Sequence, residues 1–473
     1  MSKVSITFFG GVNEIGGNKI LLRDHHSGIG IYLDFGKSFK VSRQYYEFPF
    51  TYPESIEELI SIGAIPPDRR LYTRLTKQDF KIGCDAGRDP DPSVDAVFIS
   101  HSHLDHYGHI SLLNRRIPIY VGECAKRIIL AASSLIYQRY SPEVIYDCLD
   151  LKTFRTNDEI IIHKNNAELV VRPIHVDHSI PGAYGFIIYT SIGTIAYTGD
   201  FRKHGPHKHM TEEFIKELEK EEIKALIVEG THALYSEMMS EADVFEKISI
   251  ITEETDNLVI ADFSRSDLDR FATFYRVARK TGRVLVIDAK RYSILSTILE
   301  SPGILAKDID LNSDVIALID EKKRRMSPGE KNVWNIVPED KKVDLSEIHK
   351  NPEKYIFTVV FGGAKDIKTL RPPAGSVYIL SSSEPVNEER EISFEKLLNW
   401  LEHFGVAAYH IHSSGHATPL DIRELIERAD PEIAIPVHTE HPVLLRNFIS
   451  RIKWMIPESK GARIEIPSGS TSP

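Results

Sequence analysis

The sequence of 473 residues contains little cysteine and no long apolar run. Its three cysteines, Cys84, Cys124 and Cys148, are widely spaced and form no CxxC pair, which indicates a reducing, cytoplasmic compartment. No stretch of about eighteen apolar residues occurs, so we expect no membrane span and no membrane partner. The N-terminus lacks the basic and then apolar layout of a signal peptide, so we expect no export signal.

The chain also lacks an excess of positive charge, because its formal net charge is −10 at pH 7. A basic field over the whole surface, which would attract nucleic acid from a distance, is therefore not expected. If the protein binds nucleic acid, a local groove and metal charge have to supply the attraction. The composition, 42% hydrophobic and 27% charged, is otherwise that of a globular protein of two or three domains.

The sequence does contain a regular alternation of strand and helix patterns, which is typical of an α/β protein. Short apolar strands and turn glycines occupy the first 35 residues, and the proline-rich segment 38–92 indicates a long insertion or covering segment. Strands alternate with helices over 94–229. From about residue 233 the pattern becomes that of a doubly wound parallel sheet.

These patterns predict two domains, one inserted into the other. The first domain is expected at 1–232, the inserted domain at 233–404, and the return of the first domain at 405–473. The returning part is expected to begin with a strand at Ala407–Ile411.

The most informative segment is His101-Ser102-His103-Leu104-Asp105-His106, which follows an apolar strand ending at Ser100. Its three imidazoles and one carboxylate form a metal-ligand cluster with room for two ions. His101 and His103 lie on the same side of an extended segment and can hold one ion. Asp105 and His106 can reach a second ion as the chain turns. The alternative is a polar loop with surplus histidines.

Two metal ions need more than four ligands, and three later strand ends can supply them. His178 follows the strand that ends at Ile174, Asp200 follows a strand over Thr194–Thr198, and His438 follows Val437. Taken alone, each is more often a surface, capping or turn residue. Because ligands at strand ends converge on one edge of a sheet, their ordered occurrence after the first cluster favours a shared site.

Together these residues resemble the ligand pattern of the metallo-β-lactamase fold: His-x-His-x-Asp-His, then His178, then Tyr197-Thr198-Gly199-Asp200. Three later motifs resemble those of its β-CASP branch, which contains nucleases. They are Glu229 in Val228-Glu229-Gly230-Thr231, His416 in His412-Ser413-Ser414-Gly415-His416, and His438 in Ile435-Pro436-Val437-His438-Thr439-Glu440.

The opening Gly10-Gly11-Val12-Asn13-Glu14-Ile15-Gly16-Gly17-Asn18 and Ser381-Ser382-Ser383-Glu384-Pro385 are also similar to ribonuclease J, so that the resemblance covers about residues 4–445. It implies an α/β fold in which a metallo-β-lactamase αββα sandwich carries an inserted doubly wound β-CASP domain.

The resemblance implies two zinc ions, with manganese as the alternative metal, and it assigns seven ligands. One ion would be held by His101, His103 and His178, and the other by Asp105, His106 and His438, with Asp200 bridging the pair. The ions would lower the pKa of a shared water and so supply hydroxide. The activity implied is hydrolysis of RNA phosphodiester bonds in RNA processing or decay, by a 5′→3′ exonuclease, an endonuclease or both.

Catalytic roles are implied for Asp105, Glu229 and His416. His416 is the candidate general acid, with Glu229 accepting its other N–H and keeping it charged. His412 and Ser414 are predicted to donate hydrogen bonds to a neighbouring phosphate, and Ser382 to bind phosphate as well. The alternatives are a polar turn before the helix at Leu420 for the first two, and an ordinary loop for Ser382.

Two further sets of histidines lie near these motifs. His109 follows the first cluster, and His204, His207 and His209 follow Asp200. We interpret them as surface residues, with contacts to the metal site or the substrate as the alternative.

Three features depart from ribonuclease J. The segment 38–92 is longer, Phe361-Gly362-Gly363-Ala364 replaces a Ser-Gln-Gly-Glu segment, and no C-terminal domain like that of the bacterial enzymes follows His438. Whether the chain forms a homodimer, as is usual in that family, therefore stays open.

Two other functions also stay open: a small-molecule metallohydrolase of the thioesterase or lactonase type, and a non-catalytic RNA-binding subunit. The complete ligand set, Glu229 and the His412–His416 cluster favour the nuclease.

Overall fold

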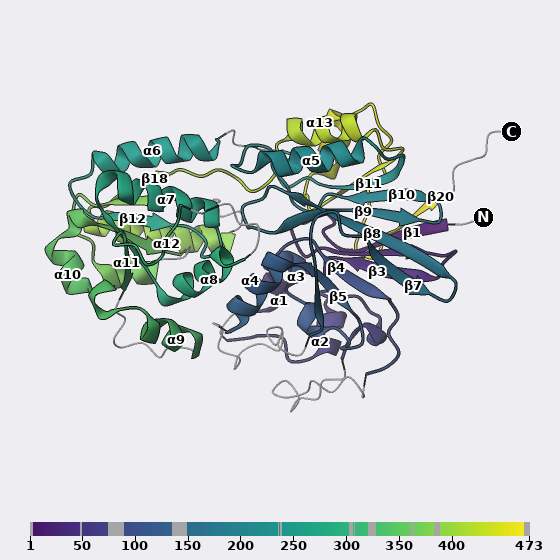
Figure 1. Ribbon diagram of the computed structural model, residues 1–473, viewed down its shortest axis with the longest axis horizontal. Coiled ribbons are helices and arrows are strands. Elements are labelled where there is room, and N and C mark those ends of the chain that lie inside the picture. The colour runs from purple at the N-terminus through teal and green to yellow at the C-terminus, as the bar shows by residue number, and fades with distance from the viewer. Residues whose placement is uncertain are drawn as a thin grey trace.

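The computed structural model describes all residues except 1–2, 48–49, 74–88, 135–148, 235, 237–238, 302–305, 307, 320–327, 361–363, 383–387 and 468–473. Two parts lie side by side in Figure 1: a sandwich of two sheets on the right, and a third sheet with its own helices on the left. Three residues named above, Cys84, Cys148 and Ser383, lie outside the described residues.

The first sheet of the sandwich has the strand order β20-β1-β2-β3-β4-β5-β6. Its strands are β1 (Lys3–Gly10), β2 (Lys19–Asp24), β3 (Ile29–Leu33), β4 (Ala96–Ile99), β5 (Ile119–Gly122), β6 (Leu151–Phe154) and β20 (Arg463–Pro467). Strands β20 to β3 pair antiparallel and β3 to β6 pair parallel. Every residue of β4 is buried, as expected for a strand that is covered on both faces.

The second sheet has the order β19-β11-β10-β9-β8-β7. Its strands are β7 (Ile160–Lys164), β8 (Ala167–Val176), β9 (Ala183–Thr190), β10 (Gly193–Tyr197), β11 (Ile223–Glu229) and β19 (Ala434–Val437). Side chains from both sheets form one core between them, for example Phe8, Phe98, Phe186 and Ile227. The alternation of buried and less buried residues in β8 follows from this one-sided packing.

Helices cover the outer faces of both sheets. Beneath the first sheet lie α1 (Phe39–Tyr45), α2 (Ile56–Ser61), α3 (Leu104–Tyr107) and α4 (Glu123–Ser134), and above the second lie α5 (Lys208–Leu218), α13 (Pro419–Ala429) and α14 (Pro442–Phe448). The layers run helix, sheet, sheet, helix, which confirms the predicted αββα sandwich.

The third sheet is entirely parallel, in the order β15-β14-β13-β16-β12-β17-β18. Its strands are β12 (Val259–Asp262), β13 (Val284–Ile287), β14 (Ile316–Ile319), β15 (Lys342–Val343), β16 (Tyr355–Val359), β17 (Val377–Leu380) and β18 (Ala407–His410). One face packs on α6 (Glu241–Glu253), α7 (Leu268–Thr281), α8 (Ala289–Leu299) and α9 (Pro328–Ile336), and the other on α10 (Leu345–Lys350), α11 (Ala364–Leu370) and α12 (Glu388–Phe404). This is the predicted doubly wound α/β arrangement.

Helix α7 shows how the local sequence sets the ends of these elements. The side chain of Asp267 accepts a hydrogen bond from the backbone N–H of Arg270 and so caps the first turn. The helix stops at Gly282, whose φ of 68° most other residues adopt only at a cost.

The inserted part ends later along the chain than the sequence indicates. Strand β18 pairs in parallel with β17, so it belongs to the third sheet and not to the returning sandwich. The predicted boundary after residue 404 therefore divides this sheet, and we place the boundary after His410 instead. A strand pattern alone does not say which sheet the strand joins, because the pairing partner is set by the tertiary fold.

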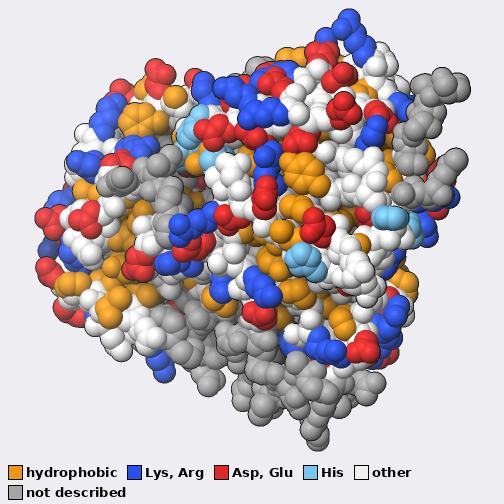
Figure 2. Space-filling model, turned by 45° about the vertical axis from the view of Figure 1, so that its right-hand side comes forward, with side chains coloured by type: hydrophobic (Ala, Val, Ile, Leu, Met, Phe, Trp, Pro, Cys, Tyr) orange, Lys and Arg blue, Asp and Glu red, His pale blue; other side chains and the backbone are white. Residues whose placement is uncertain are grey.

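Figure 2 shows one face of the molecule. Acidic and basic side chains are interspersed among the described residues of this face, and they form no extended patch of one charge there. This distribution agrees with the net charge of −10. Among the helices described, none combines the length and the apolar composition that crossing a lipid bilayer requires.

Candidate metal centre

The seven predicted ligands lie at strand ends on one edge of the sandwich. Strands β8, β10 and β19 share one direction in the second sheet, so their carboxyl ends meet at this edge. They are followed by His178, Asp200 and His438, in that order. From the facing sheet, β4 leads into His101 and His103, and then into Asp105 and His106 on α3.

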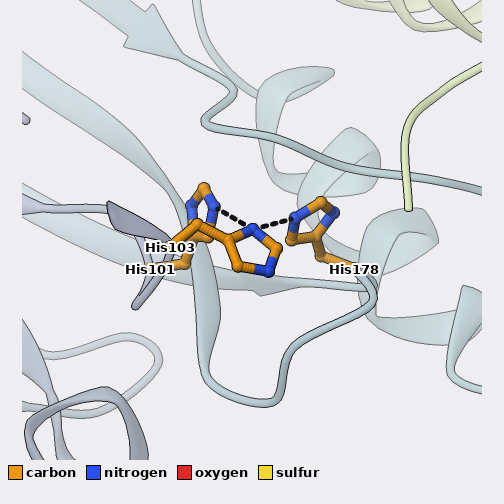
Figure 3. Close-up of side chains that lie close together, drawn as sticks. All are labelled: His101, His103 and His178. Atoms are coloured by element: carbon orange, nitrogen blue, oxygen red, sulfur yellow. Dashed lines mark hydrogen bonds between the residues drawn. The ribbon is translucent and has the colours of Figure 1, made fainter. Parts of the chain in front are cut away.

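Three imidazoles point into one common space. His103 Nδ1 lies 3.0 Å from His101 Nε2 and 3.1 Å from His178 Nε2, as Figure 3 shows. Burial is the main cause that lowers the pKa of all three rings, to about 4 for His103, which keeps the rings neutral. One ring nitrogen facing two others at this distance is the arrangement of ligands around a shared ion.

Asp105, His106 and His438 form a second group beside the first, with ligand atoms within 4.8 Å of one another. Asp200 lies between the two groups. Its Oδ2 is 3.0 Å from His106 Nε2 and 3.7 Å from both His101 Nε2 and His438 Nε2. This central carboxylate has the position that a bridging ligand of two ions requires.

The unsatisfied atoms of the cluster fit divalent cations. Among the described residues, His106 Nε2 and Asp200 Oδ1 are both buried without a hydrogen-bond partner that meets the usual geometry. Burial opposes the charged form of His106, but the carboxylates of Asp200, Asp34 and Asp105 outweigh it and raise the pKa of His106 well above its ordinary value. The cluster thus combines free lone pairs with surplus negative charge, as a metal site does.

The outer nitrogen of four of the five ligand rings lies against a neighbour, which turns the other nitrogen toward the cluster. His106 Nδ1 lies 2.8 Å from Asp34 Oδ2, and His178 Nδ1 lies 2.5 Å from the carbonyl oxygen of Gly415. His101 Nδ1 lies 3.0 Å from the Ser100 hydroxyl, and His438 Nδ1 lies 2.8 Å from the Thr231 hydroxyl. Such partners set the tautomer and orientation of metal-ligating histidines.

The backbone is drawn tightly around Asp105. A Cβ added at Gly36 would lie 1.6 Å from the Asp105 carbonyl oxygen, and one at Gly16 would lie 2.5 Å from Asp105 Oδ2. Only glycine allows both segments to approach this closely. His438 itself has a φ of 53°, a strained conformation for a non-glycine residue that is often found at functional sites.

Glu229 and His416 form a pair at the edge of the cluster. His416 Nδ1 lies 3.1 and 3.2 Å from the two carboxylate oxygens of Glu229, and 3.8 Å from Asp200 Oδ2. Burial alone would lower the pKa of His416, but Glu229 followed by Asp200 and Asp105 raises it to about 9. The raised pKa favours the charged form of His416 at neutral pH, and its role as proton donor stays a prediction.

Comparison with known proteins agrees with this geometry. A family model described as "Beta-lactamase superfamily domain" matches residues 77–255. Ribonuclease J from Mycoplasma genitalium is 25% identical over 361 residues, covering 74% of this chain and 58% of that protein. The chain thus has the metallo-β-lactamase fold and is similar in sequence to ribonuclease J.

Two further proteins match over nearly the whole of this chain. Ribonuclease J from Pyrococcus abyssi is 24% identical over 470 residues, covering 94% of this chain and 91% of that protein. A crystal structure of a protein of unknown function from Enterococcus faecalis V583 has a TM-score of 0.74 at 24% identity and covers 98% of this chain and 100% of its own. The first curated relatives are longer, and the chain spans 58% of their length.

The predicted phosphate-binding residues lie beside the cluster in different settings. Ser414 Oγ accepts the backbone N–H of His416 at 3.1 Å and lies 2.6 Å from His232 Nε2. His412 turns toward the end of β17, with Nδ1 3.3 Å from the Ser381 carbonyl oxygen. The hydroxyl of Ser382 is buried and has no hydrogen-bond partner among the described residues. Their role in binding phosphate stays a prediction.

The interpretation of two other histidines as surface residues is wrong. His109 is 1% exposed and packs beneath α3, where its backbone N–H donates to the Phe35 carbonyl. His204 is only partly exposed, and its Nε2 donates to the Ser414 carbonyl oxygen at 2.9 Å. His207 is partly exposed and His209 is exposed, and none of these four histidines belongs to a metal group formed by the described residues.

Sequence reasoning missed three residues of the site. Asp34 ends β3 and orients His106, and the only local signal is a polar residue at a strand end. His232 follows Glu229 and Thr231, and it contacts Ser414 with its ring 5.7 Å from that of His416. Arg202 follows Asp200 and donates to the Ser414 carbonyl. A single arginine in a strand-end loop gives no sign of such a contact.

Proposed function

We propose that this chain hydrolyses RNA phosphodiester bonds with the help of two divalent ions. The observation that carries the proposal is the Glu229–His416 pair, which adds a proton donor to the histidine–carboxylate cluster. Hydrolysis of a phosphodiester at neutral pH needs both an activated water and a proton for the leaving oxygen. The ribonuclease J relatives support RNA as the substrate.

We assign His101, His103 and His178 to one ion, Asp105, His106 and His438 to the other, and Asp200 to both. Zinc is the proposed metal, with manganese as the alternative, because imidazole and carboxylate ligands suit both. Ions held there supply hydroxide at neutral pH and neutralise charge on the phosphate. The ligand carboxylate Asp105 is held in place by the close approach of Gly16 and Gly36.

His416 delivers the proton to the leaving oxygen. Its Nδ1–H is donated to Glu229, which leaves Nε2–H as the proton to be transferred. Glu229 is itself fixed by the backbone N–H groups of Phe201 and Thr231, at 3.0 and 3.2 Å. The Glu229 carboxylate thus orients the His416 imidazole and favours its charged form. Ser414, Ser382 and His412 are proposed to bind a neighbouring phosphate.

An end-labelled RNA incubated with the metal-loaded protein tests this function. We expect cleavage by the wild type, a loss of about 10²–10⁴-fold in His416→Ala, and no detectable cleavage in Asp105→Ala. His163→Ala, which changes an exposed histidine of β7, is the control and should cleave normally. Unchanged cleavage in both site variants would exclude the mechanism. Mononucleotides released over time indicate an exonuclease, and discrete fragments an endonuclease.

The same preparations should be assayed against thioester and lactone substrates. A small-molecule metallohydrolase would use the same seven ligands, but it has no need for the Glu229–His416 pair. Hydrolysis of these substrates by a protein that leaves RNA intact would replace the nuclease proposal with this alternative.

A further inference from the structure

Arg202 is a fully buried arginine that joins four segments of the chain. Its Nε donates to Asp177 Oδ1 at 3.2 Å, and its Nη2 donates to Asp269 Oδ2 at 2.5 Å. Its Nη1 donates to Glu241 Oε1 at 3.3 Å and to the Ser414 carbonyl oxygen at 3.2 Å. The side chain is 0% exposed, so these partners replace all of its hydration.

The four partners come from both parts of the molecule. Asp177 follows β8 and Ser414 lies in the loop before α13, on the sandwich side. Glu241 opens α6 and Asp269 lies in the first turn of α7, in the inserted part. Arg270 of α7 donates to the same Glu241 oxygen at 3.1 Å, so two buried guanidinium groups share this carboxylate. The cluster therefore ties the inserted part to the sandwich.

The residues around Arg202 also contact the loop that carries His416, the proposed proton donor. The Ser414 carbonyl oxygen accepts from both Arg202 and His204, at 3.2 and 2.9 Å. The next carbonyl, of Gly415, accepts from His178, and the Ser414 hydroxyl accepts the backbone N–H of His416. The loop that carries His416 is thus held by its backbone between a proposed ligand and Arg202.

Apolar contacts also join the two parts here, because Cys124 and Ile180 of the sandwich pack in one buried cluster with Leu268 of α7. A cavity of about 270 Å³ lies in the seam, lined on one side by Asp177 and His178 and on the other by Leu268 and Asp269. The hydrogen bonds of Arg202 add fixed directions to these apolar contacts. Burial alone would lower the pKa of Arg202, but Asp177, Asp269 and Glu241 raise it above its ordinary value, so the guanidinium stays charged.

We propose that Arg202 is a positioning residue, which holds the His416 loop at the correct place between the metal cluster and the inserted part. The inference rests on the proposed role of His416 as proton donor. A guanidinium is needed because it donates in several fixed directions at once, whereas a lysine ammonium at the same place cannot reach four acceptors. A displacement of the donor by about 1 Å costs on the order of 10²-fold in rate.

The decisive experiment is a double-mutant cycle on RNA cleavage. We expect Arg202→Lys to lower kcat by about 10–100-fold, with a smaller change in KM. In a His416→Ala background, Arg202→Lys should lower kcat by less than about threefold, because the imidazole that Arg202 positions is already absent. Additive losses would overturn the proposal, since they would mean that Arg202 acts independently of His416.

A substrate with an activated leaving group separates positioning from general structural damage. Hydrolysis of a p-nitrophenyl phosphodiester needs little help from a proton donor, because p-nitrophenolate leaves without one. Arg202→Lys should therefore keep most of this activity and its full metal content while it loses RNA cleavage. Equal loss on both substrates, or loss of metal, would contradict the proposal.

Hydrogen exchange of the metal-free protein gives a readout that does not depend on activity. The peptide covering residues 412–418 should exchange faster in Arg202→Lys than in the wild type, because its backbone loses a buried anchor. Arg428→Lys, which alters ion pairs between α5 and α13, is the matched control and should leave this peptide unchanged. No difference between Arg202→Lys and the wild type would contradict the proposal.

Asp269→Asn changes the acceptor of the same hydrogen bond on the inserted part, and it replaces Arg202→Lys in these experiments if that variant does not fold. It should reproduce the exchange and cleavage effects in weaker form, and normal behaviour would overturn the proposal. If the wild type fails to cleave RNA, the proposed function fails, while the exchange measurement still decides whether Arg202 anchors the loop.

Discussion

At the scale of single residues, the site depends on buried groups that orient the proposed ligands. Asp34 is fully buried, with a φ of 59°. Its Oδ2 accepts from His106 Nδ1 at 2.8 Å, from the Tyr197 hydroxyl at 2.7 Å and from the Ser100 hydroxyl at 2.9 Å, while its Oδ1 accepts the Ser100 backbone N–H at 2.7 Å. One carboxylate thus fixes the tautomer of a ligand and the strand end that carries the metal-binding loop.

Asp34→Asn should weaken metal binding while preserving the fold. Asparagine has the same shape and tolerates a positive φ, but its amide nitrogen cannot accept a hydrogen bond. We expect the affinity for one of the two ions to fall about 10–100-fold, measured by competition with a chromophoric chelator. Asp24→Asn changes another buried carboxylate, which binds Ser191 far from the cluster, and should keep wild-type affinity. Equal metal affinities in the two variants would mean that Asp34 does not support metal binding.

At the scale of elements, the site is built where strands end and helices begin. Helix α13 starts directly after the His416 loop with a capping box, in which Thr418 Oγ1 accepts the Asp421 N–H at 3.2 Å and Asp421 Oδ2 accepts the Thr418 N–H at 3.0 Å. Proline at the first turn adds to this start signal. The cap therefore fixes the place where the loop leaves the site.

Thr418→Ala should lower both stability and cleavage, whereas Ser55→Ala should lower stability alone. Each change removes a hydroxyl N-cap, of α13 and of α2 respectively, and each is expected to cost about 1 kcal/mol in the free energy of unfolding. Only the α13 cap adjoins the His416 loop. Denaturant unfolding and RNA cleavage rates of the two variants check this difference. Equal cleavage rates would mean that the loop is held without the cap.

At the scale of the whole molecule, the cluster joins segments that the sandwich brings together from both sheets. Asp105 follows a strand of the first sheet and His438 a strand of the second, and their side chains lie 3.3 Å apart. An ion bound between them would link the two sheets, and the unfolded chain would not offer this site. Bound metal should therefore stabilise the native state by mass action.

Removal of metal by a chelator should lower the Tm of the protein by several degrees. Ions present at about 100 times their Kd stabilise the native state by about 2.7 kcal/mol each. Asp200→Ala, which removes the carboxylate between the two groups, should abolish the difference between metal-loaded and chelated protein in a calorimetric scan. A Tm that is insensitive to chelation in the wild type would exclude tight metal binding at the cluster.

Most of the fold could be predicted from the sequence because its signals are local. The apolar run before His101, the strand before Asp200 and the strand before His438 each show their length and their end in a few consecutive residues. The structure brings all seven predicted ligands together, and their role as ligands stays a prediction. The sequence also predicts a strand at Ala407–Ile411, where the structure has β18 over Ala407–His410, but it does not indicate the sheet, because β18 meets its partner β17 only in the folded chain.

The sequence by itself determined which residues could bind metal and at which strand ends they stand. Only the tertiary structure decided what orients them. Arg202 and Ser414 are 212 positions apart, and Asp34 and Tyr197 are 163 apart, yet both pairs are hydrogen-bonded. No local pattern encodes such contacts, because a buried polar group takes whichever partner the packing of distant segments places within reach.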